Sequence, residues 1–115
     1  MNIEETKNRR IFGLLGLCAK AGKIVSGTDA TILEMEKRKI QLVIIANDAS
    51  DKTKKNMKYI CEKNKVEIIE FGSIEKLSNC IGKTNKAIIG IKSKNIADGI
   101  RKSVSNENGG DLLDG

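Results

Sequence analysis

The sequence predicts a single α/β domain in which helices cover both faces of a parallel or mostly parallel sheet. Three observations predict this class. At 115 residues, the chain has the length of one domain. Helical and strand patterns alternate along it in the order α-β-α-β-α-β-α-β-α. Residues 41–46 form a continuous apolar run rich in β-branched side chains, which is typical of a strand covered on both faces.

The first predicted element is a helix that ends near Gly22 and is followed by a short strand at residues 23–25. The apolar residues that recur at helical spacing in this helix are Ile11, Leu14, Leu15 and Cys18. Gly22 is expected to end the helix because glycine readily adopts the left-handed conformation at a helix C-terminus.

A second helix is expected to follow residues 26–29, because this segment fits a capping box. The Ser26 hydroxyl can accept a hydrogen bond from a first-turn amide, and the Asp29 side chain can reach back to the cap. Ala30 and Leu33 are expected to face the core from this helix.

The remaining elements continue the alternation. They are a helix at 51–64 that buries Met57, Ile60 and Cys61, a buried strand at 66–69 with Val66, Ile68 and Ile69, a helix from Ser73 to Gly82, a strand at 87–91 and a last helix from about Ser93. Residues 1–102 are therefore predicted to form one α-β-α domain. Residues 103–115 are polar, glycine-rich and acidic, so we expect them to form a flexible tail.

Several classes of function are excluded by residue types that the chain lacks. It contains no His, which excludes Ser-His-Asp and Cys-His catalysis and His-ligated metals. It contains no Trp and only three other aromatic residues, too few for a platform on which several bases stack. The three cysteines are widely spaced in apolar helical patterns, which indicates core packing and neither a disulfide framework nor a zinc site. We therefore expect no enzyme, no metal and no cofactor.

The sequence also gives expectations about the compartment of the chain. Its longest apolar runs, such as residues 42–46, are far shorter than a membrane span. The first five residues are acidic and lack the apolar core of a signal peptide. We expect a cytoplasmic protein with reduced thiols, no membrane partner and a monomeric state.

The charge of the chain is concentrated in the predicted domain. The chain carries 21 Lys and Arg against 15 Asp and Glu, a net charge of +6. Every Lys and Arg lies within residues 1–102, whereas three of the carboxylates follow Lys102. Residues 1–102 therefore carry a net charge of +9. A compact basic domain of this kind most often binds a polyanion such as nucleic acid. The alternative is that the charge serves solubility alone.

Two segments are candidates for a binding site, because sites in α/β sheets form where strands end and helices begin. In residues 20–29, Gly27 lets a partner approach the backbone, while Lys20 and Lys23 add charge. Residues 82–86 form a basic, polar loop before a buried strand. The plainer interpretations are an ordinary capped helix for the first segment and an ordinary loop for the second.

A third candidate is Asp48, which follows the central strand and could suggest a phospho-acceptor aspartate. Such sites need further acidic residues to hold magnesium, and the first strand supplies none. We expect instead that Asp48 or Ser50 stabilises the turn and the start of the following helix.

Residues 8–102 resemble the L-seven-Ae family of ribosomal and kink-turn RNA-binding proteins, in particular its small bacterial members labelled putative ribosomal proteins. The segments that carry the resemblance are Gly27-Thr28-Asp29-Ala30-Thr31, then Lys37-Arg38-Lys39, then Leu42-Val43-Ile44-Ile45-Ala46-Asn47-Asp48-Ala49-Ser50, with Ser73, Leu77 and Ile81-Gly82-Lys83 continuing it. The resemblance implies a three-layer α-β-α sandwich around a mixed four-stranded sheet.

For function, the resemblance implies RNA recognition through the start of the second helix and the loop before the last strand. Carried over position by position, the first contact falls on Gly27, Thr28 and Asp29, and the second on Lys83, Thr84, Asn85 and Ile88. Kink-turn binders carry Asn-Glu after the glycine and a Lys beyond it, where this chain has Asp29, Ala30 and Leu33. We therefore expect affinity to depend on phosphate contacts and on salt.

Together these features predict a non-enzymatic RNA-binding protein associated with the ribosome or another ribonucleoprotein. Phosphates would be held by Lys20, Lys23, Lys37, Lys83 and Lys86. Thr28 and Asp29 would form hydrogen bonds at the helix start, while Asn85 and Ile88 would flank an extruded base. The alternative is a protein-interaction module on the same fold that has only non-specific affinity for RNA.

Overall fold

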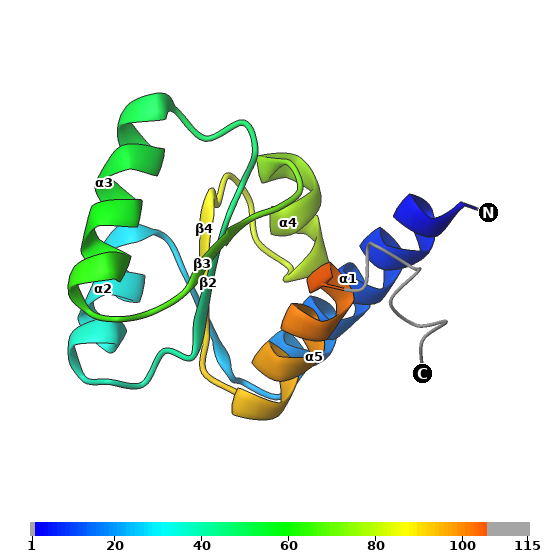
Figure 1. Cartoon of the computed structure of the whole chain (residues 1–115), viewed down its shortest axis with the longest axis horizontal. Coiled ribbons are helices and arrows are strands. Elements are labelled where there is room, and N and C mark those ends of the chain that lie inside the picture. The colour runs from blue at the N-terminus through cyan, green and yellow to red at the C-terminus, as the bar shows by residue number, and fades with distance from the viewer. Residues whose placement is uncertain (1, 106–115) are drawn as a thin grey trace.

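A computed structural model of the chain describes residues 2–105. The elements are α1 (Ile3–Lys20), β1 (Ile24–Ser26), α2 (Thr28–Glu36), β2 (Leu42–Ile45), α3 (Asp51–Lys63), β3 (Ile68–Glu70), α4 (Ile74–Cys80), β4 (Ile88–Ile91) and α5 (Lys94–Ser105). Figure 1 shows three layers, with α2 and α3 on one face of the sheet and α1, α4 and α5 on the other. The expected three-layer α-β-α sandwich is confirmed.

The sheet is mixed, with the strand order β1-β4-β2-β3. Strand β4 runs antiparallel to both of its neighbours, and only β2 and β3 form a parallel pair. The mixed sheet implied by the family resemblance is therefore confirmed, and the parallel sheet expected from the alternation is wrong. The reason is that the loop after α4 returns to the end where β2 finishes, where the Ala46 amide donates to the Ala87 carbonyl, so β4 must run back.

The sheet has two ends, an upper and a lower one in the view of Figure 1. The upper end in Figure 1 is where β1, β2 and β3 finish and β4 begins, and its segments are residues 27–28, 46–51, 71–74 and 82–87. The lower end is where the same three strands begin, and its segments are residues 20–23, 37–41, 63–67 and 92–94.

Two hydrophobic clusters fill the spaces on either side of the sheet, and strand alternation divides the side chains between them. Leu42 and Ile44 of β2 face α1, α4 and α5, whereas Val43 and Ile45 face α2 and α3. Every residue of β2 is buried, which confirms the strand covered on both faces.

Strand β4 lies just as deeply in the sheet, and one of its residues must be glycine. A Cβ atom at Gly90 would lie 2.9 Å from side-chain atoms of both Ile40 and Val25. The missing side chain lets α2 pack close to the sheet, with Thr31 and Met35 facing inward.

The inward face of α2 differs from the predicted one. Ala30 is exposed, and the side chain of Leu33 is 53% exposed, so neither is part of the core. The predicted capping box is also wrong, because Ser26 pairs with Ile89 inside β1 and Gly27 is the N-cap. The register of this short helix is therefore determined by its contact with the sheet, which a local pattern does not contain.

Two further differences concern the edges of the fold. Residues Val66, Ile68 and Ile69 are only half-buried, because β3 lies at the edge of the sheet. Helix α5 continues to Ser105, and Ser103 is buried, so the predicted tail does not begin at residue 103. Val104 packs against the larger cluster, which explains why the helix continues. The rest of the predicted tail, residues 106–115, lies outside the described residues.

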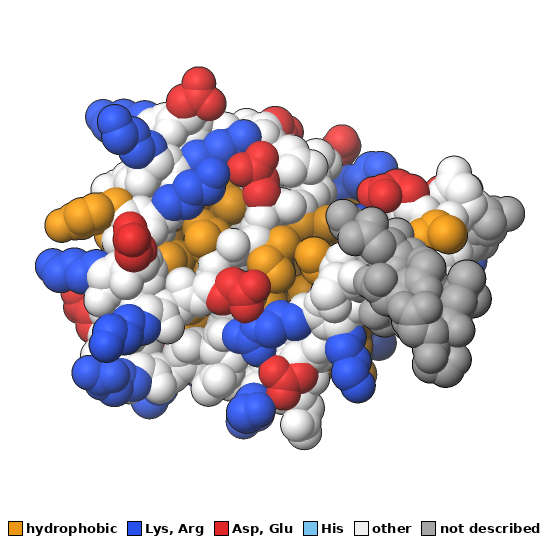
Figure 2. Space-filling model, viewed as in Figure 1, with side chains coloured by type: hydrophobic (Ala, Val, Ile, Leu, Met, Phe, Trp, Pro, Cys, Tyr) orange, Lys and Arg blue, Asp and Glu red, His pale blue; other side chains and the backbone are white. Residues whose placement is uncertain are grey.

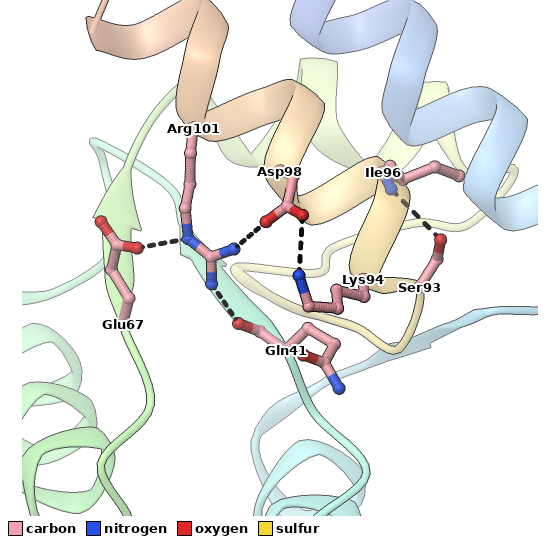
Figure 3. A network of polar contacts seen from close by, with 7 residues as sticks. All are labelled: Gln41, Glu67, Ser93, Lys94, Ile96, Asp98 and Arg101. Carbon is pink, nitrogen blue, oxygen red and sulfur yellow. Dashed lines mark hydrogen bonds and ion pairs between the residues drawn. The ribbon is translucent and has the colours of Figure 1, made fainter.

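A polar network closes the lower end of the molecule (Figure 3). The Arg101 guanidinium donates to the Glu67 carboxylate at 2.6 Å, to the Asp98 carboxylate at 2.8 Å and to the Gln41 carbonyl at 2.6 Å. Lys94 donates to the second Asp98 oxygen at 3.0 Å, and this hydrogen bond is the main reason that the pKa of Asp98 is lowered. The network ties α5 to the segments that precede β2 and β3.

Candidate nucleic-acid interface

Three helices begin at the upper end of the sheet. Strands β1, β2 and β3 run in the same direction, and α2, α3 and α4 start directly after them (Figure 1). Helix N-termini present free amides and a partial positive charge. This end therefore has the electrostatic character of an anion-binding surface.

The three helix starts differ in how their amides are satisfied. The Ser50 hydroxyl accepts from the Thr53 amide at 3.1 Å, and the Ser73 hydroxyl accepts from the Lys76 amide at 3.1 Å. Asp48 accepts from the Ile74 amide at 2.9 Å, so it stabilises the start of α4, whereas Ser50 caps α3 as expected. Helix α2 has Gly27 as its N-cap and no side-chain cap.

Gly27 joins the two segments that the sequence singled out. Its amide donates to the carbonyl of Ile88 at 2.8 Å, which places the start of α2 beside the start of β4. Its backbone has φ 93° and ψ 157°, a conformation that is essentially restricted to glycine. The Lys86 ammonium lies 3.7 Å from the position that a Cβ on Gly27 would occupy. The uncapped helix start and a cation thus share one place on the surface.

The loop before β4 is held by a buried hydroxyl. Ser78 in α4 accepts from the Lys86 amide at 2.8 Å and donates to the Lys86 carbonyl at 3.3 Å. Lys83, Thr84 and Asn85 are exposed beyond this anchor, and Asn85 adopts φ 52°. The loop therefore presents polar side chains from a fixed base next to Gly27.

Ile88 departs from its predicted role. Its side chain is 1% exposed and packs in the cluster under α2 and α3, so it does not present a surface for an extruded base. It is the first residue of a strand in the middle of the sheet, paired with Ile45. At the upper end, Ile88 contributes only its backbone carbonyl, which accepts a hydrogen bond from the Gly27 amide.

Three predicted phosphate contacts lie at the lower end, away from Gly27. Lys20 is in the last turn of α1, Lys23 precedes β1 and Lys37 follows α2. Lys37 forms an ion pair with Glu34 at 3.6 Å. The structure therefore does not bring these three residues together with Gly27, Thr28, Asp29 and the 83–86 loop. Sequence proximity to Gly27 was misleading, because β1 separates Lys23 from it.

The structure adds a groove that was not predicted from the sequence. It has a volume of about 670 Å³ and lies between the start of α2 and the side of α3. Its lining residues are Thr28, Lys52, Thr53, Lys55, Asn56, Met57 and Tyr59. A signal for it exists in the sequence, because residues 52, 55, 56 and 59 have the spacing of one helix face.

Nothing in the described residues suggests catalysis or metal binding. Residues 2–105 contain no group of three His, Cys, Asp or Glu side chains that could hold a metal ion. Burial raises the pKa of the Cys61 thiol to about 11 and also raises the pKa values of Cys18 and Cys80, which leaves all three poor nucleophiles. Within the same residues, no helix has the length and apolar character needed to cross a bilayer.

The fold and this end together define a small α-β-α domain with a ligand-accessible surface where its helices begin. Residues 9–100 match the Ribosomal protein L7Ae/L30e/S12e/Gadd45 family, and the chain belongs to that family. This confirms the resemblance identified from the sequence, and membership of this family agrees with the prediction of a non-enzymatic protein.

Two bacterial relatives are similar over most of their length. One, from Enterococcus faecium, is 33% identical over 95 residues, which cover 83% of this chain and 91% of that protein. The other, from Bacillus subtilis (strain 168), is 33% identical over 87 residues, which cover 76% of this chain and 87% of that protein. Both are named RNA-binding protein YlxQ.

Two solved structures share the fold. A protein of unknown function from Bacillus halodurans superposes with a TM-score of 0.74 at 27% identity, over 86% of this chain and 97% of that one. A 15.5 kDa RNA-binding protein from Giardia lamblia superposes with a TM-score of 0.72 at 19% identity, over 90% of this chain and 89% of that one. At that level of identity, the second likeness shows the fold alone.

Proposed function

We propose that this chain binds structured RNA at the upper end of its sheet, through the start of α2 and the 83–86 loop. The observation that carries this proposal is the hydrogen bond from the Gly27 amide to the Ile88 carbonyl, which makes one surface of two distant segments. The RNA-binding names of the two bacterial relatives support the same class of ligand. The family description, which names ribosomal proteins, is consistent with ribosomal RNA as the target. A cytoplasmic location is part of the proposal.

The groups at this surface are suited to different parts of the RNA, some to phosphates and others to bases or riboses. Lys83 and Lys86 form no ion pair with a described residue, so their ammonium groups are available to phosphates. The absent cap on α2 leaves first-turn amides for a further acceptor. Asp29 is exposed in this first turn and, when ionised, only accepts hydrogen bonds. It therefore favours base amino groups or ribose hydroxyls over phosphate.

We also propose that the RNA bound at this surface is kink-turn-like. Proteins read distorted or single-stranded RNA elements more readily than regular A-form helices, whose deep groove hides the base edges. The extended backbone at Gly27 allows an RNA backbone to approach α2 closely, since glycine itself carries no side chain. Asp29 and Ala30 replace an Asn-Glu pair, so we expect selectivity by shape together with phosphate contacts.

The test is a binding titration with a kink-turn RNA and an unkinked duplex of equal length, at two salt concentrations. We expect a preference for the kink-turn of at least tenfold, about 1.4 kcal/mol, that persists at the higher salt. Equal, salt-sensitive binding to both RNAs would contradict kink-turn recognition and leave a basic RNA-associated protein. No binding to either RNA would contradict the proposal and favour the protein-interaction module instead.

A further inference from the structure

We propose that the groove between α2 and α3 binds one unpaired RNA base, stacked on the ring of Tyr59. The inference rests on the proposed function, because the groove begins at Thr28, in the first turn of α2. A nucleotide that leaves the surface at Gly27 and Lys86 therefore enters the groove directly. Figure 2 shows Lys and Arg side chains spread over the part of the molecule where α3 lies.

The charges that line the groove match a nucleotide. Its lining contains two cations, Lys52 and Lys55, and no carboxylate. Neither lysine forms an ion pair with a described residue. On the same helix, Lys54 and Lys58 both pair with Glu70, at 3.3 and 3.7 Å. Lys54 and Lys58, which lie on α3 outside the groove, are thus neutralised by Glu70, whereas Lys52 and Lys55 inside it are available to phosphates.

The ring of Tyr59 packs on no other aromatic ring among residues 2–105. Phe12 and Phe71 pack on each other with ring centroids 4.9 Å apart, and both are half-buried. Tyr59 is 64% exposed and lines the groove. Aromatic side chains that bind unpaired bases present a free face in this way. One ring serves one base, which is consistent with a chain too poor in aromatic residues for an extended platform.

The polar groups beside the ring favour a base over an apolar peptide. Asn56 is exposed and its amide makes no hydrogen bond with a described residue, so it can offer a donor and an acceptor to a base edge. An apolar peptide in the groove would leave Asn56, Lys52 and Lys55 without acceptors. A nucleotide satisfies all three, with its base on the ring and its phosphates at the lysines.

The intrinsic fluorescence of Tyr59 can be used to test whether a base stacks on its ring. It has one Tyr and no Trp, so its intrinsic fluorescence reports Tyr59 alone. The experiment titrates the full chain with the kink-turn RNA and follows two signals, the anisotropy of a fluorescein label on the RNA and the Tyr59 emission. N-acetyl-tyrosinamide with the same RNA corrects the emission for absorption. We expect the emission to fall by at least half, with the same midpoint as the anisotropy.

Four variants separate stacking from charge. Tyr59→Ala should weaken binding about tenfold, and Tyr59→Phe, which keeps the ring, should restore it. Lys55→Ala should weaken binding about threefold, whereas Lys58→Ala, whose lysine pairs with Glu70, should change it less than twofold. Circular dichroism of each variant verifies folding.

The outcomes distinguish this inference from the proposed function. Binding by anisotropy with unchanged Tyr59 emission, and with Tyr59→Ala within twofold of the wild type, would overturn the stacking site while leaving RNA binding in place. No binding in the anisotropy titration would overturn both.

Discussion

The two ends of the sheet carry many cations each, but their backbones have opposite character. At the upper end, α2, α3 and α4 begin, so helix dipoles add positive charge to Lys83 and Lys86. At the lower end, α1, α2 and α3 finish, and Lys20 and Lys63 lie in the last turns of α1 and α3. A cation there neutralises the negative end of its own helix.

Several cations at the lower end also form ion pairs with neighbouring carboxylates. Lys92 donates to Glu34, which is the main reason that the pKa of Glu34 is lowered, and Lys37 joins the same carboxylate. Arg101 and Lys94 pair with Asp98 (Figure 3). The comparison shows that the net charge of a chain overstates the charge available to a ligand. The direction of nearby helices and the neighbouring carboxylates decide what remains.

The largest difference in RNA affinity should appear between two double Lys→Glu variants, one at the upper end and one at the lower end. Lys83→Glu with Lys86→Glu should weaken RNA binding at least tenfold, about 1.4 kcal/mol, because Lys86 lies beside the uncapped start of α2 and Lys83 is exposed in the same loop. Lys20→Glu with Lys63→Glu changes the net charge by the same amount and should change binding less than threefold. Anisotropy titrations at one salt concentration compare the pairs. Equal losses would mean that only net charge matters.

Gly27→Ala tests the backbone of the upper end. Alanine at φ 93° and ψ 157° is strained, so we expect the free energy of unfolding to fall by about 1–3 kcal/mol. Gly13→Ala is the control, since it lies inside α1 with open space around it and should raise stability by about 0.5–1 kcal/mol. Urea unfolding followed by circular dichroism measures both variants. A neutral Gly27→Ala would show that the conformation at the start of α2 relaxes freely.

Arg101→Ala tests the lower end as a structural element. It removes the hydrogen bonds to Glu67, Asp98 and the Gln41 carbonyl, so the free energy of unfolding should fall by about 1–2 kcal/mol. RNA affinity should remain within twofold of the wild type. Lys102→Ala, at an exposed neighbour, should leave both quantities unchanged. A loss of RNA affinity in folded Arg101→Ala would place the lower end in the interface.

The smallest effect should come from Arg38→Gly. Arg38 follows α2 at φ 60°, a left-handed position that glycine occupies without strain, and its amide donates to the Met35 carbonyl at 2.9 Å. We expect stability to rise by about 0.5–1 kcal/mol. Thermal unfolding measures the rise, and the RNA titration should show no change. Reduced RNA binding by this more stable variant would show that the Arg38 side chain contacts RNA.

Local sequence determined the elements of this protein and several of their ends. The buried strand at residues 41–46, the helix at 51–64 and the caps at Ser50 and Ser73 follow from patterns within a few residues, because burial periodicity and capping are local properties. The resemblance to a known family added the mixed sheet, and it assigned the expected RNA contacts to Gly27–Asp29 and Lys83–Asn85, which lie within the two candidate segments that the local pattern had indicated.

Only the tertiary structure decided how these elements face one another. Pairing of Ile88 with Ile45 reverses β4, buries a residue predicted to contact RNA and places its carbonyl against Gly27. Contact with Gly90 determines which face of α2 is buried and leaves Leu33 exposed. Lys23 and Gly27 are close in sequence but occupy opposite ends of a strand, whereas Gly27 and Lys86 are adjacent in space. These relations depend on strand pairing between distant residues, and a pattern read along the chain does not contain it.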